Sequence, residues 1–321
     1  MKIFTQAERR VLLHGLGRSG TSWLMKILDH HPASLTSHEP EGFVSALKGD
    51  ALGSVGAIQA YIDALFDQRA LRAMRKRPIL RKDYRHALAH RARVGMLYGL
   101  SGLSRAVRPL AKRINRVQIP DLAQGRIGFH VVKCVSHTQA IPSLLEHGQD
   151  FKCIFIIRHP CGQIHSMLKG GRSGKMPGRY FLPDRDMMAA IPDYVTGAHD
   201  LQEKDFSNLE ISAHRWAVIN HHAVEAVRGS ENAYLMRYED LCADPIGEAR
   251  KLFDWLGLGL HADCEAFLRQ SVEAEADAEG YHDLVRNPRL AADKWRSEMP
   301  AEDVETVLSI CRRTPVFDLF A

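Results

Sequence analysis

Val11-Leu-Leu-His-Gly-Leu-Gly-Arg-Ser-Gly-Thr-Ser-Trp-Leu-Met-Lys-Ile-Leu28 is a stretch in which a short apolar run, a glycine-rich turn and an amphipathic segment follow one another. The turn runs from Gly15 to Gly20, and apolar residues recur after it at the spacing of one helix face. A strand, a glycine turn and a helix in this order present backbone N–H groups and a helix N-terminus to an anion. The stretch therefore predicts a phosphate-type binding site near the start of the chain.

The turn partly fits the P-loop of nucleoside triphosphatases, which reads G-x-x-x-x-G-K-[ST]. Gly15 and Gly20 have the required spacing, but Thr21 stands where that motif has its lysine. Because the lysine reaches the β- and γ-phosphates, its loss argues against ATP hydrolysis and phosphoryl transfer.

The same turn also matches the Rossmann dinucleotide fingerprint, G-x-G-x-x-G, through Gly15, Gly17 and Gly20. Glu39 follows roughly 20 residues later, where an acid would bind the ribose. The segment 33–38, which should form the second strand, is hardly apolar. A dinucleotide-dependent oxidoreductase is therefore an alternative, and so is a turn that binds no ligand.

The composition is that of an ordinary globular protein. The chain has 321 residues, of which 45% are hydrophobic and 25% charged. No apolar run approaches the ~20 residues of a membrane span, and residues 1–10 are too polar for a signal peptide. Six cysteines are scattered without a C-x-x-C pair, so neither a zinc site nor a disulfide framework is indicated. We expect a cytoplasmic protein.

Charge is distributed unevenly along the chain. Between Arg69 and Arg116 there are fifteen lysines and arginines and a single acid, Asp83. This segment carries +14, whereas the whole chain carries only +5. A surface this basic would favour contact with an anionic polysaccharide or with the inner membrane leaflet, and we expect a peripheral contact of this kind through residues 69–116. No nucleic-acid-binding module is recognisable.

Strands and helices alternate along the rest of the chain. Strands are predicted at 128–133, 152–158 and 232–237, and helices at 57–98, 137–147, 211–227 and 245–256. Pro160 is placed to begin another helix, and Lys169 to Gly178 reads as a flexible loop that could act as a lid. This alternation predicts an α/β fold with a P-loop-like, mainly parallel sheet flanked by helices, and with a helical basic insertion at about 57–120.

Separate motifs, in order and at fitting distances, resemble those of sulfotransferases that use 3′-phosphoadenosine 5′-phosphosulfate (PAPS). Arg18-Ser-Gly-Thr-Ser-Trp-Leu24 is similar to the family's 5′-phosphosulfate loop, and Arg237-Tyr-Glu-Asp-Leu241 to a second family stretch. Leu284 to Arg289, followed by Lys294-Trp-Arg296, is similar to the segment that closes over the nucleotide. The similarity is closest to the tyrosylprotein and carbohydrate branch, and it implies a single sulfotransferase domain over residues 1–321.

The resemblance implies a set of residues that bind the donor nucleotide. Arg158, with Ser166 eight residues later, would hold the 3′-phosphate, since a guanidinium offers a planar donor fork and a permanent charge. The other implied nucleotide ligands are Arg18, Ser19, Gly20, Thr21, Ser22, Trp23, Tyr238, Arg286 and Lys294.

The resemblance also implies the catalytic groups. Glu39 stands where the tyrosylprotein branch has its catalytic base, while Arg18 and Lys133 would stabilise charge on the leaving nucleotide. His137 is the second candidate base, since another branch has a histidine after this strand, but here it comes two residues later than in that pattern. The alternatives are a helix-capping or ion-paired acid for Glu39 and a surface lysine at the end of a strand for Lys133.

The resulting hypothesis is transfer of a sulfuryl group from PAPS to a hydroxyl of a carbohydrate, glycolipid or peptide, with release of 3′,5′-ADP. We expect no metal, because the sulfuryl group carries one negative charge and the sequence shows no carboxylate pair for Mg²⁺. The oxidoreductase and a non-catalytic nucleotide-binding module are the competing functions. The Arg158–Ser166 pair, together with Tyr238 and Arg286, argues against the oxidoreductase, because a dinucleotide fold does not require these residues. The presence of Glu39 and Lys133 argues against the non-catalytic module.

Overall fold

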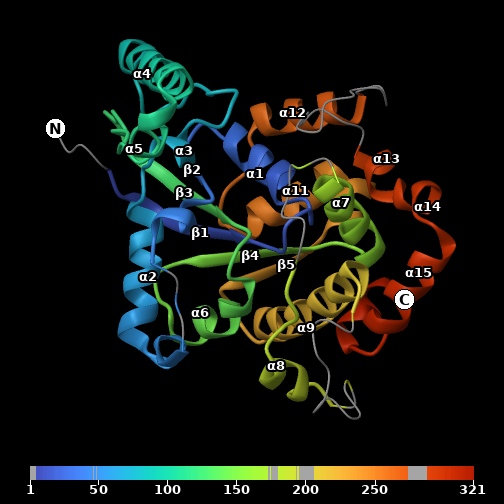
Figure 1. The fold of residues 1–321 in the computed structure, drawn as a ribbon. Helices are drawn as coiled ribbons and strands as arrows, with labels where there is room; N and C mark the ends of the chain where they lie inside the picture. Colours follow the sequence, from blue (N-terminus) through green and yellow to red (C-terminus); the bar gives the residue numbers. More distant parts are fainter. Residues whose placement is uncertain are drawn as a thin grey trace.

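The computed structural model describes residues 5–45, 47, 49–172, 174, 180–192, 194, 206–273 and 288–321. A five-stranded sheet, in the order β2-β3-β1-β4-β5, runs through the middle of the molecule, and every pair of neighbouring strands is parallel (Figure 1). The strands are β1 (Ala7–His14), β2 (Ser34–His38), β3 (Ile127–Cys134), β4 (Lys152–Ile157) and β5 (Ala233–Arg237). The predicted α/β class with a parallel sheet is confirmed.

Helices connect and cover the strands. In the first half of the chain they are α1 (Thr21–His30), α2 (Val55–Asp67), α3 (Leu71–Met74), α4 (Ala87–Ala106), α5 (Ala111–Ile114), α6 (Ile141–His147) and α7 (Pro160–Arg172). In the second half they are α8 (Arg185–Ala189), α9 (Asn208–Arg228), α10 (Tyr238–Ala243), α11 (Pro245–Trp255), α12 (Ala262–Glu273), α13 (Pro288–Asp293), α14 (Trp295–Glu298) and α15 (Ala301–Cys311). Single 3₁₀ turns are η1 (Pro40–Phe43), η2 (Gly49–Gly53), η3 (Arg108–Leu110), η4 (Thr138–Ala140) and η7 (Pro315–Phe320). None of the described helices has the length and apolarity that crossing a membrane requires.

The sheet separates two hydrophobic layers. Leu12 packs in the layer that contains residues of α2, α6, α9 and α15, whereas Val11 and Leu13 pack in the layer of α1, α11 and α12. Figure 1 shows these helices on the two opposite faces of the strands. Successive strand residues point to opposite faces, so a strand covered on both sides must be apolar throughout. This explains why the buried parts of β1 and β4, residues 11–13 and 153–157, are continuous apolar stretches.

The connections reverse direction at β1. From β1 the chain moves outward to β2 and returns through β3, and it then crosses to the other side of β1 to form β4 and β5. In open parallel sheets, ligands bind outside the carboxyl ends of the strands at such a switch point. The topology therefore places the glycine turn that follows β1 at the expected position of a ligand site.

One predicted loop is helical. The expected lid from Lys169 to Gly178 begins inside α7, which continues to Arg172. Gly170 is buried within this helix, and α7 packs against α14 and α15. Tertiary packing thus offsets the low helix propensity of glycine here. Residues 173 and 175–179 of the expected loop lie outside the described residues.

The basic segment is only partly a solvated surface. Four of its cations are buried, namely Arg69, Lys82, Arg85 and Arg93. A third hydrophobic cluster, which includes Leu35 of β2, Leu71 of α3, Leu97 of α4 and Ile114 of α5, joins the segment to the edge of the sheet. Part of the positive charge is therefore structural, and the peripheral contact through residues 69–116 stays a prediction.

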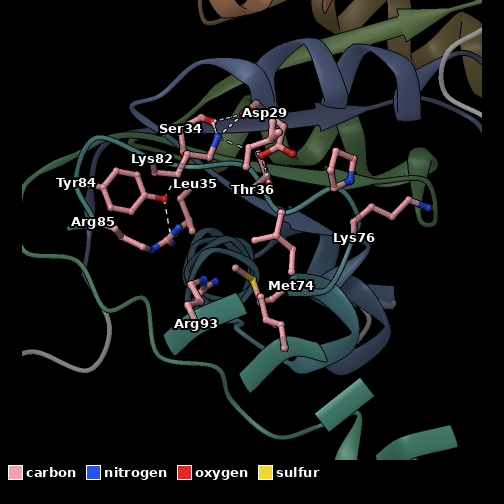
Figure 2. A pocket seen from close by; sticks show the side chains of 14 residues that line it. Asp29, Ser34, Leu35, Thr36, Met74, Lys76, Lys82, Tyr84, Arg85 and Arg93 are labelled. Atoms are coloured by element: carbon pink, nitrogen blue, oxygen red, sulfur yellow. Dashed lines mark hydrogen bonds and ion pairs between the residues drawn. The ribbon is translucent and has the colours of Figure 1, made fainter. Parts of the chain in front are cut away.

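Asp29 at the end of α1 links two buried lysines. Lys26 donates to Asp29 Oδ2 at 2.8 Å, and the Lys82 ammonium lies 3.3 Å from Oδ1 and also donates to Ser34. Figure 2 shows Lys82 pointing toward Asp29 and Ser34. Burial by itself raises the pKa of Asp29, but the charges of Lys82 and Lys26 and the hydrogen bond from Lys26 together outweigh this and lower the pKa overall. The carboxylate is therefore ionised and compensates two buried positive charges.

We expect Asp29→Asn to lower the free energy of unfolding by about 3–5 kcal/mol, because it leaves buried ammonium groups without their counter-charge. The matched control is Asp63→Asn, which removes the carboxylate of the half-exposed Arg10–Asp63 pair and should cost about 0–1 kcal/mol. Urea denaturation of both variants measures the difference, and equal losses would contradict the structural role of Asp29.

Candidate functional site

Two glycines of the turn stand where no side chain fits. A Cβ atom on Gly15 would lie 2.4 Å from the carbonyl oxygen of Ile156 in β4. Gly20 has a φ of +100°, and a Cβ there would lie 2.3 Å from Cδ2 of Tyr238. Positive φ and close backbone approach are the two conditions that require glycine. The turn thus packs tightly against β4 and α10, and this packing fixes the position of the start of α1.

Arg158, which follows β4, and Gln163 of α7 bind the carbonyl groups of the turn. Gln163 Nε2 donates to the Gly17 carbonyl at 3.0 Å, and Arg158 Nη1 donates to the Arg18 carbonyl at 3.3 Å. The first N–H groups of a helix have no partner within the helix, and at α1 they belong to Thr21 and its neighbours. The carbonyls of the turn are therefore engaged by the protein, while the helix N-terminus offers donors to an anion.

Lys133 connects the turn with Glu39. Its ammonium group donates to Glu39 Oε1 at 2.7 Å and to Ser22 Oγ at 3.3 Å. The Lys133 side chain is almost wholly buried, at 4% exposure, whereas the Glu39 side chain is 47% exposed. Because β2 and β3 are neighbours and parallel, their carboxyl ends bring these two residues together. The alternative of an exposed strand-end lysine is wrong for Lys133.

Glu39 is an ion-paired acid and not a helix cap. It precedes η1 with a φ of 52°, and its side chain makes no capping hydrogen bond. Burial raises the pKa of Glu39, but the charge and hydrogen bond of Lys133 outweigh this, so that the pKa is lowered overall. Lys76 and Arg72 contribute to the same lowering. The carboxylate is therefore ionised at neutral pH and half open to solvent.

His137 lies in the loop after β3 and lines the site. Glu41 Oε1 accepts hydrogen bonds from the backbone N–H groups of Val135 and Ser136, at 3.0 and 3.3 Å. Those contacts fix the loop just before His137, which has a φ of 59°. Glu41 was not predicted from the sequence, because it acts through backbone N–H groups and belongs to no motif. Gln163, which precedes Ser166 by about one helical turn, was not predicted either.

Arg158 and Ser166, the predicted 3′-phosphate pair, lie on either side of Arg18. Arg18 Nε donates to Ser166 Oγ at 2.9 Å, and Arg158 bonds the Arg18 carbonyl from the other side. The Arg158 guanidinium lies over the Tyr238 ring, 4.7 Å from its centroid, and Nη2 donates to the Ala291 carbonyl at 2.7 Å. Trp23 packs edge-on against the same tyrosine. The structure thus gathers these residues around the turn without a direct Arg158–Ser166 bond.

The C-terminal segment was expected to supply Arg286 and Lys294 to the nucleotide site, and the structure describes only Lys294. Arg286 lies outside the described residues. The Lys294 ammonium is 3.3 Å from Glu298, and the same carboxylate accepts hydrogen bonds from His165 and Lys169. In this arrangement Lys294 belongs to a surface ion-pair cluster next to α7, and its role as a nucleotide ligand stays a prediction.

The turn opens into a cleft of about 840 Å³. One wall comes from the turn, the ends of β2 and β3 and the segment around α3, and the other from α7, α9 and the residues before α8. The lining side chains with polar or charged ends are Arg18, Thr21, Ser22, Glu39, Arg72, Lys76, Lys133, Ser136, His137, Thr138, Gln139, Gln163, Tyr180, Asp184, Ser212 and Arg215. No group of metal-ligating side chains occurs within the described part of the chain.

Comparison with known proteins gives a consistent result. The family model described as "Sulfotransferase family" matches residues 10–262. Carbohydrate sulfotransferase 2 of Mus musculus is 24% identical over 184 residues, which are 53% of this chain and 35% of that relative. Carbohydrate sulfotransferase 3 of Homo sapiens is 29% identical over 77 residues, 24% of this chain and 16% of the relative. The chain thus matches only 16–35% of the length of these relatives.

Two solved structures are similar as well. A sulfotransferase domain from the olefin synthase of Synechococcus PCC 7002 has a TM-score of 0.46 and 15% identity, and covers 95% of both chains. Mouse sulfotransferase SULT7A1, solved in complex with PAP, has a TM-score of 0.46 and 14% identity, and covers 98% of this chain and 89% of that chain.

We expect Gly20→Ala to destabilise the protein by about 1–3 kcal/mol, because alanine disfavours positive φ and its Cβ would meet the Tyr238 ring. Gly102→Ala is the control, since Gly102 lies in α4 with no atom within 4 Å of an added Cβ. Alanine there should stabilise by about 0.5–1 kcal/mol. Thermal unfolding of both variants measures the sign, and a stabilised Gly20→Ala protein would contradict the packing of the turn.

Proposed function

The chain belongs to the sulfotransferase family, whose enzymes transfer a sulfuryl group, and we propose that its donor is PAPS and its acceptor a hydroxyl of a carbohydrate, glycolipid or peptide. The observation that carries the proposal is the contact of Lys133 with both Ser22 and Glu39. One ammonium group thereby joins the anion-binding turn to a carboxylate that faces the cleft. A Rossmann oxidoreductase does not require such a connection.

Unsatisfied polar atoms around the turn fit an anionic donor. Ser19 Oγ and Arg158 Nε are buried and have no hydrogen-bond partner among the described residues. Buried polar groups of this kind are normally satisfied, so that they favour a ligand with acceptor oxygens. In the proposal the N-terminus of α1, with Thr21 and Ser22, receives the 5′-phosphosulfate. Arg158, Ser166 and Tyr238 receive the 3′-phosphoadenosine.

The chemistry follows from these positions. An acceptor oxygen attacks sulfur, the bond from sulfur to the bridging oxygen of the nucleotide breaks, and 3′,5′-ADP leaves. Catalysis of such an in-line displacement relies on positioning and on charge stabilisation. Arg18 and Lys133 would neutralise the charge that grows on the leaving oxygen.

Glu39 would accept the proton of the attacking hydroxyl. Lys133 keeps this carboxylate ionised in the absence of donor, since it lowers the pKa of Glu39. When Lys133 turns its charge toward the donor, the same carboxylate loses part of that stabilisation and becomes a stronger base. His137 lines the same cleft and is the alternative base.

We expect Glu39→Gln to lower kcat by about 10²–10⁴-fold, because the amide cannot accept the proton. Binding of 3′,5′-ADP, followed by calorimetry, should persist. Asp184→Asn is the matched control, since Asp184 lines the cleft but lies on the opposite wall, and kcat at saturating acceptor should stay near that of the wild type. Near-normal turnover of Glu39→Gln, together with a large loss in His137→Ala, would reassign the base to His137.

The donor is tested by thermal unfolding with 3′,5′-ADP, NAD and ATP. A ligand present at about 100 times its Kd stabilises the folded state by about 2.7 kcal/mol, which raises the melting temperature. We expect 3′,5′-ADP to raise it and equal concentrations of NAD and ATP to leave it nearly unchanged. A shift with NAD alone would support the dinucleotide oxidoreductase instead.

A further inference from the structure

Among the described residues, two cations in the cleft form no ion pair, although their charges help to lower the pKa of Glu39, which is itself paired with Lys133. Arg72 belongs to α3 and Lys76 follows that helix, and both line the cleft that Glu39 and Lys133 also line. Within the part of the chain that the structure describes, neither side chain has a hydrogen-bond or ion-pair partner. In Figure 2, Lys76 extends away from the buried pair of Lys82 and Asp29. These two charges therefore differ from the buried lysines, whose role is structural.

More positive charge surrounds the same place. Burial lowers the pKa of Arg75, and the nearby charges of Arg105, Arg72 and Arg77 lower it further. Like charges that gather at a surface destabilise the folded state through repulsion. Glu39 attracts Arg72 and Lys76, but within the described residues no acid forms an ion pair with any member of this group. A cluster of this kind is explained by an anionic ligand.

Among the described residues, the opposite wall of the cleft offers no comparable free positive charge. It is lined by apolar side chains of α7, α9 and the segment before α8, including Ile164, Met167 and Ile219. Arg215, the arginine of this wall that the structure describes, donates to the Phe181 carbonyl at 3.1 Å. A negative group entering the cleft beside Glu39 is therefore attracted to the wall that carries Arg72 and Lys76.

We propose that the acceptor carries a negative charge of its own beside the reactive hydroxyl, and that Arg72 and Lys76 bind this charge. The inference rests on the proposed function and narrows the acceptor to an acidic one, which we take to be a glycan because the relatives that the chain matches are carbohydrate sulfotransferases. Both cations lie in the lining of the cleft, which the flat surface of a membrane does not enter. A flexible acidic chain reaches them and can continue over Arg75, Arg77 and Arg105 toward α4.

The test compares two probes that differ in charge alone, a hyaluronan decasaccharide and its carboxyl-reduced form. Their Kd values are measured by calorimetry on the protein saturated with 3′,5′-ADP. The variants are Arg72→Gln with Lys76→Gln, and the matched control is Lys112→Gln with Arg116→Gln. The control removes the same charge from exposed residues of the basic segment that do not line the cleft. All four side chains are solvent-exposed, so folding should be unaffected.

We expect the wild type to bind the acidic probe about tenfold more tightly than the neutral one, since two partly exposed ion pairs contribute a few-fold each. Arg72→Gln with Lys76→Gln should abolish this preference, and the control should keep it within about twofold. Raising the salt concentration should weaken only the acidic probe.

Equal binding of both probes by the wild type, or a preference that survives Arg72→Gln with Lys76→Gln, would overturn the inference. An equal loss in the control variant would also overturn it, because the attraction would then belong to the whole basic segment. Binding to phosphatidylserine vesicles that depends on Arg72 and Lys76, without an effect on the acidic probe, would assign the cluster to a membrane. Failure of the wild type to bind 3′,5′-ADP would instead refute the proposed function.

Discussion

The close approach of the glycine turn to β4 and α10 is the constraint on which the site depends. Gly15 meets the Ile156 carbonyl and Gly20 meets the Tyr238 ring, at distances that exclude a Cβ atom. This contact fixes the N-terminus of α1 at the point where the sheet connections reverse. It also brings Tyr238, and with it the Arg158 guanidinium, next to the turn. Both ends of the proposed nucleotide site are therefore set by one packing contact.

Charge in this protein serves two separate purposes. Lys26, Lys82 and Asp29 form a buried cluster that ties α1 to the basic segment, and its carboxylate is kept ionised by the two lysines. Lys133 and Glu39 are instead paired at the edge of the cleft, where the carboxylate is open to an acceptor. A buried pair that loses one member leaves an uncompensated charge, whereas the pair at the cleft can exchange partners when a donor arrives.

The sequence predicts the fold well where the pattern is strong. The continuous apolar run at 153–157 identifies β4, the apolar residues within 128–133 identify β3, and the glycine turn identifies the junction of β1 and α1. The strand β2 is difficult to predict because Ser34–His38 is polar, and its burial comes from the basic segment that packs on it. Lys169 was expected in a loop but is helical, since contacts with α14 and α15, distant in sequence, stabilise the end of α7.

The site can be predicted from the sequence where its residues follow from the order of the strands, and not where they depend on side-chain packing. Glu39 and Lys133 meet because neighbouring parallel strands end together, which the order of elements suggests. The insertion of Arg18 between Arg158 and Ser166 depends on side-chain geometry that spacing does not encode. Glu41, which holds the loop before His137, acts through backbone N–H groups and leaves no charge pattern to recognise. Arg72 and Lys76 enter the cleft only through the packing of α3 on β2.

A crystal structure of the complex with 3′,5′-ADP tests the central claim most directly, because it locates both phosphates relative to the turn. The proposal predicts the 5′-phosphate against the N-terminus of α1 beside Lys133, and the 3′-phosphate within hydrogen-bond distance of the Arg158 guanidinium. A nucleotide bound with Arg158 facing away from its 3′-phosphate, or bound away from the glycine turn, would contradict it.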